Sequence, residues 1–240
     1  MINNKKIVLF FLPACLLVMA CKKESVKTAP VVVYNATHSA NAITATWNGN
    51  SFTATAINTA GASGIVNANY INLAAGTNSL FIQNGTASLL NKNVYTTAGN
   101  GYTVLIYDTG KASNTNKVLL LKDDATRVAD SLFKFRFLYC MPDTAALHLI
   151  ISRTTGRSDT ITNRLFIGKE AVASSVEIFS TAKADSAIIR LVKAGSYQQV
   201  LALPAQQFVA NISYSFIYSG LPTGTGTAAP ALKLITHKLP

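Results

Sequence analysis

Residues 133–140 read FKFRFLYC, and this stretch decides the fold class. Three phenylalanines and a tyrosine occupy every second position, and the positions between them hold Lys134, Arg136, Leu138 and Cys140. Because successive side chains of a strand point to opposite faces, this period of two predicts a β-strand with one buried and one partly wet face. Similar runs of five to eight residues, separated by Gly, Asn and Pro, continue along the chain. The sequence therefore predicts an all-β protein.

The clearest turn signal lies at Asn48-Gly49, directly after the strand-like run ITATW at residues 43–47. A two-residue type I′ hairpin needs positive φ at both central positions, which Asn and Gly tolerate best. We therefore expect a tight hairpin at this point.

The second half of the chain repeats the first. Residues 33–36 match residues 104 positions further on, GYTVLIYDTG (101–110) matches SYSFIYSG (213–220) at an offset of 112, and VLLLKDD (118–124) matches LKLITHK (232–238) at 114. An offset that grows slowly indicates insertions in the connections, since loops tolerate length changes better than strands.

This repetition predicts two homologous β-sandwich domains, at residues 31–124 and 132–240, joined by a linker at 125–131. Each would hold about seven short strands, which is enough for two packed sheets.

The amino terminus has the layout of a secretory signal peptide at residues 1–20, with Lys5 and Lys6 followed by an apolar run that is too short to span a bilayer. The run ends at Ala20 and Cys21, and LLVMAC resembles the lipobox of bacterial lipoproteins. That resemblance implies cleavage between Ala20 and Cys21, lipidation of Cys21, and a lipidated tether at residues 21–30. Because Lys22 rather than Asp follows the cysteine, we expect an outer-membrane location, with the leaflet open. The membrane would then be a partner through the lipid.

The formal net charge is +11 at pH 7, and it is unevenly distributed. Residues 28–116 carry only Lys92, Asp108 and Lys111, whereas residues 117–240 carry fourteen basic residues that are scattered singly. A nucleic-acid surface gathers its basic residues in a patch or stripe. The pattern therefore indicates a solvated outer face, and we expect no nucleic-acid partner.

The opening segments VVVYNATHSANAITATWNG (31–49) and FRFLYCMPDTAALHLIIS (135–152) resemble the first hairpin of the bacterial family called domain of unknown function 4397. The segments YINLAAGTNSLFI (70–82) and TTAGNGYTVLIY (96–107) resemble two later features of that family. The resemblance implies tandem immunoglobulin- or transthyretin-like β-sandwich domains on a secreted or anchored protein. It brings no established activity and hence no site residues.

No catalytic constellation or metal site is visible, and we expect no cofactor. The three histidines, His38, His148 and His237, lie far apart and lack ligand-spaced neighbours. His148 is expected on an exposed strand face. The carboxylates Asp123, Asp124 and Asp130 could bind Ca²⁺ but lack the spacing of a calcium loop, so a solvated linker is the favoured interpretation.

Aromatic rings could instead stack on sugars. Alternation places Trp47, Tyr102, Tyr214 and Tyr218 in the core and leaves Tyr34, Tyr95 and Tyr139 open. Cys140 is expected to be a buried small hydrophobe.

Four Asp-(Ser/Thr)-aliphatic-or-Ala triplets resemble an O-glycosylation acceptor of some Gram-negative lineages. Their acceptor residues would be Ser131, Thr144, Thr160 and Ser186.

The sequence supports three functional hypotheses. The first is an outer-membrane-anchored lipoprotein that is not an enzyme and that binds a surface polymer, a glycan or a partner envelope protein. The second is an envelope-polymer hydrolase whose site is assembled from residues distant in sequence. The third is a purely structural spacer. A concave pocket with converging carboxylates or histidines would favour the second.

Overall fold

The computed structural model describes residues 26–38, 43–53, 55–56, 64–108, 116–124, 126–142, 145–154, 156–168 and 176–238. The expected signal peptide, its cleavage site at Ala20 and Cys21, and the acceptor Thr144 lie outside these residues. Among the described residues, no helix is long and apolar enough to cross a membrane.

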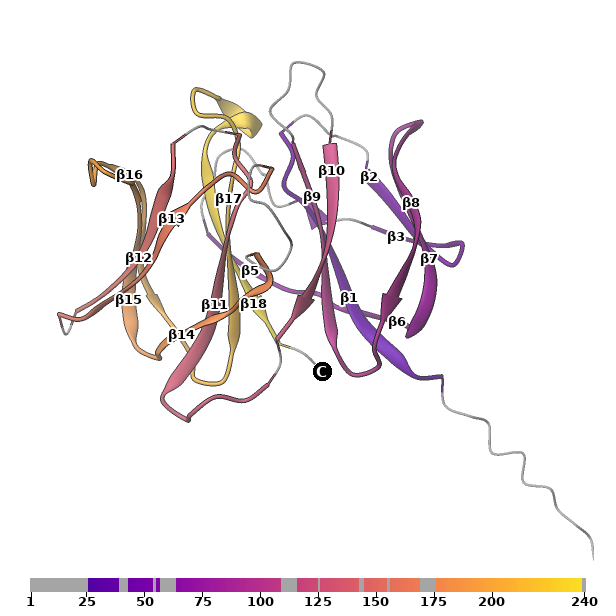
Figure 1. Cartoon of the computed structure of the whole chain (residues 1–240), viewed down its shortest axis with the longest axis horizontal. Helices are drawn as coiled ribbons and strands as arrows, with labels where there is room; N and C mark the ends of the chain where they lie inside the picture. The colour runs from indigo at the N-terminus through magenta and orange to yellow at the C-terminus, as the bar shows by residue number, and fades with distance from the viewer. Residues whose placement is uncertain are drawn as a thin grey trace, which may run out of the picture.

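The strands form four β-sheets, which we call A to D and whose strands are given below. They are stacked in the order B, A, C and D, as Figure 1 shows from right to left. Sheets A and B form the first sandwich, and sheets C and D form the second. The prediction of an all-β protein with two sandwiches is confirmed.

The strands of the first sandwich come from the first half of the chain. Sheet A consists of β10 (Asn116–Asp123), β9 (Gly101–Asp108), β1 (Thr28–Asn35) and β4 (Thr55–Ala56), with β6 (Ile71–Ala74) also paired to β1. Sheet B consists of β3 (Asn50–Thr53), β2 (Ile43–Trp47), β7 (Gly76–Asn84) and β8 (Ala87–Thr96).

The second sandwich is built mainly from the second half. Sheet C consists of β14 (Ser180–Lys183), β11 (Leu132–Tyr139), β17 (Ser213–Ser219), β18 (Ala231–His237) and β5 (Gly64–Asn67). Sheet D consists of β13 (Ser158–Arg164), β12 (Leu147–Arg153), β15 (Ser186–Lys193) and β16 (Gln199–Gln207). A short 3₁₀ turn, η1 (Gly226–Ala228), lies between β17 and β18.

The two sandwiches share one strand-pairing scheme. β1 pairs in parallel with β9, as β11 does with β17, and Val33 faces Val104 as Phe137 faces Phe216. The offsets between these pairs are the 104 and 112 found in the sequence. β2 between β3 and β7 likewise corresponds to β12 between β13 and β15.

Strand β5 departs from this symmetry. β5 belongs to the first half of the chain, yet it pairs in parallel with β18 at the edge of sheet C. The expected first domain, residues 31–124, therefore contributes backbone to the sheet of the second sandwich.

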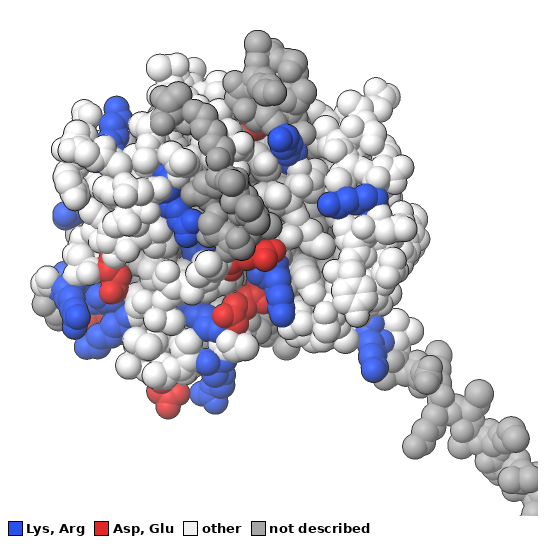
Figure 2. Space-filling model, viewed as in Figure 1, with Lys and Arg blue, Asp and Glu red and all other residues white. Residues whose placement is uncertain are grey.

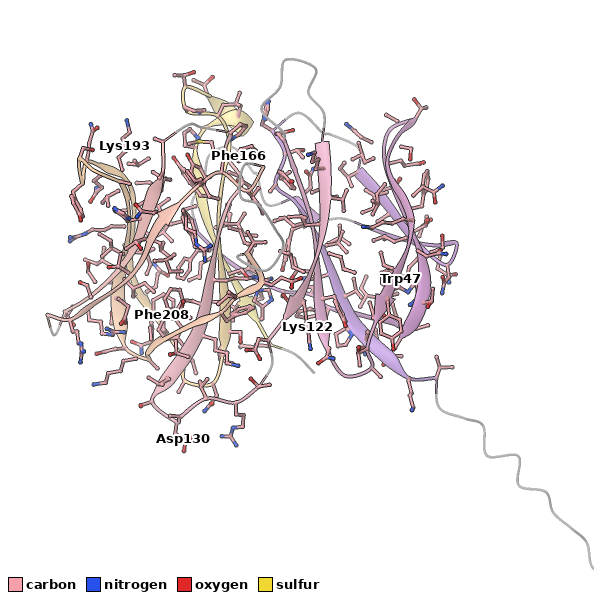
Figure 3. All side chains as sticks on the ribbon, in the orientation of Figure 1. Trp47, Lys122, Asp130, Phe166, Lys193 and Phe208 are labelled. Carbon is pink, nitrogen blue, oxygen red and sulfur yellow. The ribbon has the colours of Figure 1, made fainter. Side chains whose placement is uncertain are left out.

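Each sandwich has its own apolar core. Trp47 lies between sheets A and B, and Phe208 lies between sheets C and D (Figure 3). Phe208 stacks on Phe133 with ring centroids 4.5 Å apart. The expected core positions of Trp47, Tyr102, Tyr214 and Tyr218 are confirmed, since all four are buried.

A third apolar cluster joins the two sandwiches. It contains Val32, Leu105 and Leu121 from sheet A together with Leu138 and Ile217 from sheet C. The second face of the 133–140 stretch is therefore buried, and the expectation of a partly wet face was wrong. Sheet A covers that face, which a single strand's periodicity cannot reveal.

The turn at Asn48-Gly49 has the predicted form. The φ angles are 49° at Asn48 and 81° at Gly49, and Trp47 pairs with Asn50 across the hairpin. The Asn48 side-chain amide also donates to Asn78 Oδ1 at 2.7 Å, which ties the turn to β7.

The buried face between sheets A and C predicts that both sandwiches unfold together. Leu80 lies in the core of the first sandwich and Leu203 in that of the second. Calorimetry of the full chain should show one transition. Leu80→Ala or Leu203→Ala should shift that whole transition, because each deletion costs about 2–5 kcal/mol. Two separate transitions, each sensitive to one variant, would contradict this expectation.

Candidate functional site

Arg136 is the centre of a polar cluster buried between sheets A and C. It lies on the face of β11 that meets sheet A, and its side chain is 0% exposed. Its NH2 group donates to Asp123 Oδ1 at 2.5 Å and its Nε donates to Ser215 Oγ at 2.8 Å. Its NH1 group donates to the Lys122 carbonyl at 3.1 Å, and the Phe179 ring centroid lies 4.7 Å from Cζ. This one side chain of sheet C therefore binds both sheets.

Asp123 ends β10 and completes the ion pair from sheet A. Thr103 Oγ1 donates to its carboxylate at 2.8 and 2.9 Å, and the Tyr70 hydroxyl donates to Oδ2 at 2.7 Å. Burial alone would raise the pKa of Asp123, but the Arg136 guanidinium and these hydrogen bonds hold it below the usual range. The carboxylate is therefore ionised and fully partnered.

His237 closes the cluster from β18. Its Nδ1 lies 2.6 Å from the Tyr70 hydroxyl, and its Nε2 lies 2.7 Å from Ser215 Oγ. Since the only Tyr70 proton goes to Asp123, Tyr70 must accept from a protonated Nδ1. The Ser215 hydroxyl accepts from Arg136 and has its own proton left to donate to an unprotonated Nε2. A neutral His237 with its proton on Nδ1 therefore satisfies every partner.

Burial accounts for the neutrality of this imidazole. Desolvation lowers the pKa of His237 from 6.5 to about 4, and the Arg136 charge acts in the same direction, although Asp123 opposes it. Burial also raises the pKa of Tyr70, which keeps the phenol protonated as a donor. This buried polar cluster, which we call the lock, has no exposed reactive group. It consists of Tyr70, Thr103, Asp123, Arg136, Ser215 and His237.

A cleft of about 440 Å³ lies beside the lock, lined in part by Asp123, Asp124 and Glu177. Lys134 Nζ donates to Asp124 Oδ2 at 2.5 Å and also contacts Thr126 Oγ1. Burial raises the pKa of Asp124, but the hydrogen bonds from Lys134 and Thr126 outweigh it and leave that pKa below the ordinary value. Two of the three carboxylates are therefore held ionised in pairs.

Acid catalysis of glycosidic cleavage requires a carboxylic acid whose pKa is raised, opposite a second carboxylate. The pKa values of Asp123 and Asp124 are instead lowered, so neither side chain is suited to act as the acid. Among the described residues, no group of three His, Cys, Asp or Glu side chains is placed to hold a metal ion.

The structure separates the three histidines. His38 pairs with Asp108, while His237 joins the lock. His148 was expected on an exposed face, and that expectation was wrong. It does point away from Leu147 and Leu149, but it is only 6% exposed because the Tyr197 ring covers it and the Asn163 N–H donates to Nδ1.

The solvated-linker interpretation of the aspartates holds only in part. Asp130 is exposed and pairs with Arg127 at 3.5 Å. Asp123 is fully buried, so for that residue the interpretation was wrong. Cys140 is a buried free thiol as expected, and burial raises its pKa.

The remaining candidate residues lie on the surface or in the interior. Of the three tyrosines left open, Tyr34 and Tyr139 are buried and Tyr95 is exposed. Ser131 and Thr160 are exposed, and Ser186 is half-buried.

Sequence reasoning missed the lock, although a signal existed. Asp123 and His237 occupy equivalent positions in the repeat at the offset of 114, and Thr103 and Ser215 do so at 112. The same pair of polar positions thus recurs in β9 and β10 and in β17 and β18, which marks these positions as a shared feature of the two copies.

The lock predicts a specific dependence of stability on pH. Unfolded His237 takes up a proton near pH 6.5, but folded His237 does so only near pH 4. The unfolded state therefore binds more protons between these values, and the free energy of unfolding should fall as pH drops from 6.5 to 4, by about 3 kcal/mol.

Denaturant titrations of the full chain across this pH range measure the loss. His237→Gln, which cannot titrate, should flatten the slope. An equal slope in the variant and the parent chain would rule out this role for His237.

Comparisons with known proteins place the chain in a family. A crystal structure from Bacteroides ovatus ATCC 8483, described as "a putative cell adhesion protein", aligns with 89% of this chain and 97% of its own at 11% identity and a TM-score of 0.25. A likeness with that TM-score does not establish a shared fold. No curated protein matches. The family model "Domain of unknown function (DUF4397)" matches residues 29–150, which is half of the chain. The chain therefore belongs to the DUF4397 family.

Proposed function

We propose that this protein is an outer-membrane-anchored lipoprotein whose two sandwiches form a non-catalytic module that binds a surface polymer, a glycan or a partner envelope protein. In this proposal the second sandwich is a further copy of the DUF4397 domain, which the shared strand pairing and the slowly growing offsets support.

The observation that carries the proposal is the fusion of the two sandwiches into one body. An apolar cluster, a buried ion pair and the strand β5 all cross from one sandwich to the other. Tandem domains held by a linker alone would move independently. A fused pair holds its outer faces and loops in fixed relative positions, as a binding module or a spacer requires.

The position of β1 fits an anchor at the amino terminus. β1 begins at Thr28, which is exposed at one end of sheet A (Figure 1). Seven residues from Cys21 to the strand would span at most about 25 Å. The lipid would then hold the body close to the membrane surface.

The hydrolase hypothesis would use the cleft beside Asp123 and Asp124. The ion pairs of both carboxylates favour the binding module instead, because neither group is poised as an acid.

The anchor is testable with the full chain. Cys21→Ser should abolish incorporation of labelled palmitate and release the protein from the membrane fraction, because the acyl chains provide the membrane affinity. Globomycin should cause the uncleaved precursor to accumulate. Cys15→Ser is the matched control, since this cysteine lies within the expected signal peptide. A Cys21→Ser protein that still carries label would refute the anchor.

A further inference from the structure

The outer face of sheet B is free of charge. Its outward positions include Thr46, Thr77, Ser79, Phe81, Asn91, Asn93 and Tyr95, which we call the neutral face. The opposite side of the same strands carries Ala45, Leu80 and Ile82 in the core, which fixes the orientation of the neutral face. On the side of the molecule drawn in Figure 2, the half with sheets A and B shows fewer charged side chains than sheets C and D and the boundary.

The fold does not dictate this chemistry. Sheet D has the same pairing, and its residues equivalent to Thr46 and Phe81 are Ile150 and Arg190, which face each other as Thr46 and Phe81 do. One copy of the fold thus presents an apolar residue and a charge where the other presents a hydroxyl and a ring.

Two aromatic rings lie along the neutral face. Tyr95 is 69% exposed and pairs with Thr77 across the strands, and Phe81 is half-buried and pairs with Asn91. Four residues along a strand and one strand across separate the two rings by about 14 Å. The pair Ser79 and Asn93 lies between them. Rings therefore flank a row of hydroxyl and amide groups.

The β8 edge of this sheet is protected against strand addition. β8 is one of the two edge strands, and Lys92 lies on its core-facing side opposite Leu80 yet reaches solvent. An inward-pointing charge on an edge strand opposes pairing with another chain. We therefore consider the face, and not the β8 edge, as the ligand surface.

We propose that the neutral face binds an uncharged polysaccharide, an inference that rests on the proposed function and names its ligand class. Sugar C–H groups pack on aromatic rings, and sugar hydroxyls exchange hydrogen bonds with Ser, Thr and Asn side chains. A charged polymer would find no ion partner among the seven residues of this face. The strands hold these groups in place before binding, so little ordering entropy is lost.

Affinity electrophoresis of the full chain in detergent tests the proposal, with dextran, laminarin or mannan in the gel and heparin as the charged polymer. At least one neutral polysaccharide should retard the protein, and Tyr95→Ala should weaken that retardation about tenfold, as loss of a central aromatic contact does. Tyr197→Ala is the matched control, since Tyr197 is 70% exposed beside sheet D. It should bind as the parent chain does.

Three results would overturn the proposal. They are no retardation by any of the three neutral polysaccharides, equal losses in Tyr95→Ala and Tyr197→Ala, or a loss of heparin retardation in Tyr95→Ala. Lipid labelling at Cys21 separates this failure from that of the proposed function, because an anchored protein without glycan binding would still be displayed.

Discussion

The ion pair between Arg136 and Asp123 is the interaction on which the arrangement of the four sheets depends. It lies where two sheet faces exclude water from each other, and both side chains are fully buried. A buried charge is costly unless it is paired and hydrogen-bonded. Arg136 satisfies its donors on both sheets only in one relative position, so the pair fixes how the sandwiches meet. We infer that the apolar contacts hold sheets A and C together and that the ion pair determines their relative position.

This arrangement explains the unusual appearance of the central strands. β9, β11, β17 and β18 are buried on both faces, which is common for covered sheets but uncommon for a sheet at the outside of a sandwich. The outer sheets B and D each have one face that no other sheet covers. Figure 3 shows Trp47 and Phe208 in the two sandwich cores, with Phe166 at the boundary between them. The molecule is therefore a stack of four layers with three apolar interiors.

Much of this fold could be predicted from the sequence. Alternation in FKFRFLYC identified the strand, Asn48-Gly49 identified the hairpin, and the offsets of 104 and 112 gave the equivalent strand pairs. The boundary between the sandwiches could not be predicted, because Arg136 on a strand is normally solvated and only the facing sheet removes its water. The parallel pairing of β5 with β18 could not be predicted either, because the sequence of a short strand does not indicate which strand it pairs with.

The candidate site was hidden for a related reason. Tyr70, Asp123 and His237 are far apart in sequence, and only the stacking of sheets A and C brings them together. Tyr95 could be recognised as a possible sugar contact from its residue type, but its exposure required the structure. Repeated polar positions in apolar strands are the one sequence feature that would have indicated the lock.

The central claim is tested most directly by a double-mutant cycle on the free energy of unfolding, with Arg136→Met, Asp123→Leu and the combination. Each single change should cost about 3–5 kcal/mol, because it leaves an unpaired buried group, and the double change should cost far less than their sum. The exposed pair of Arg127 and Asp130 provides the control cycle, with an expected coupling below about 1 kcal/mol. A coupling between Arg136 and Asp123 no larger than that of the exposed pair would contradict the account.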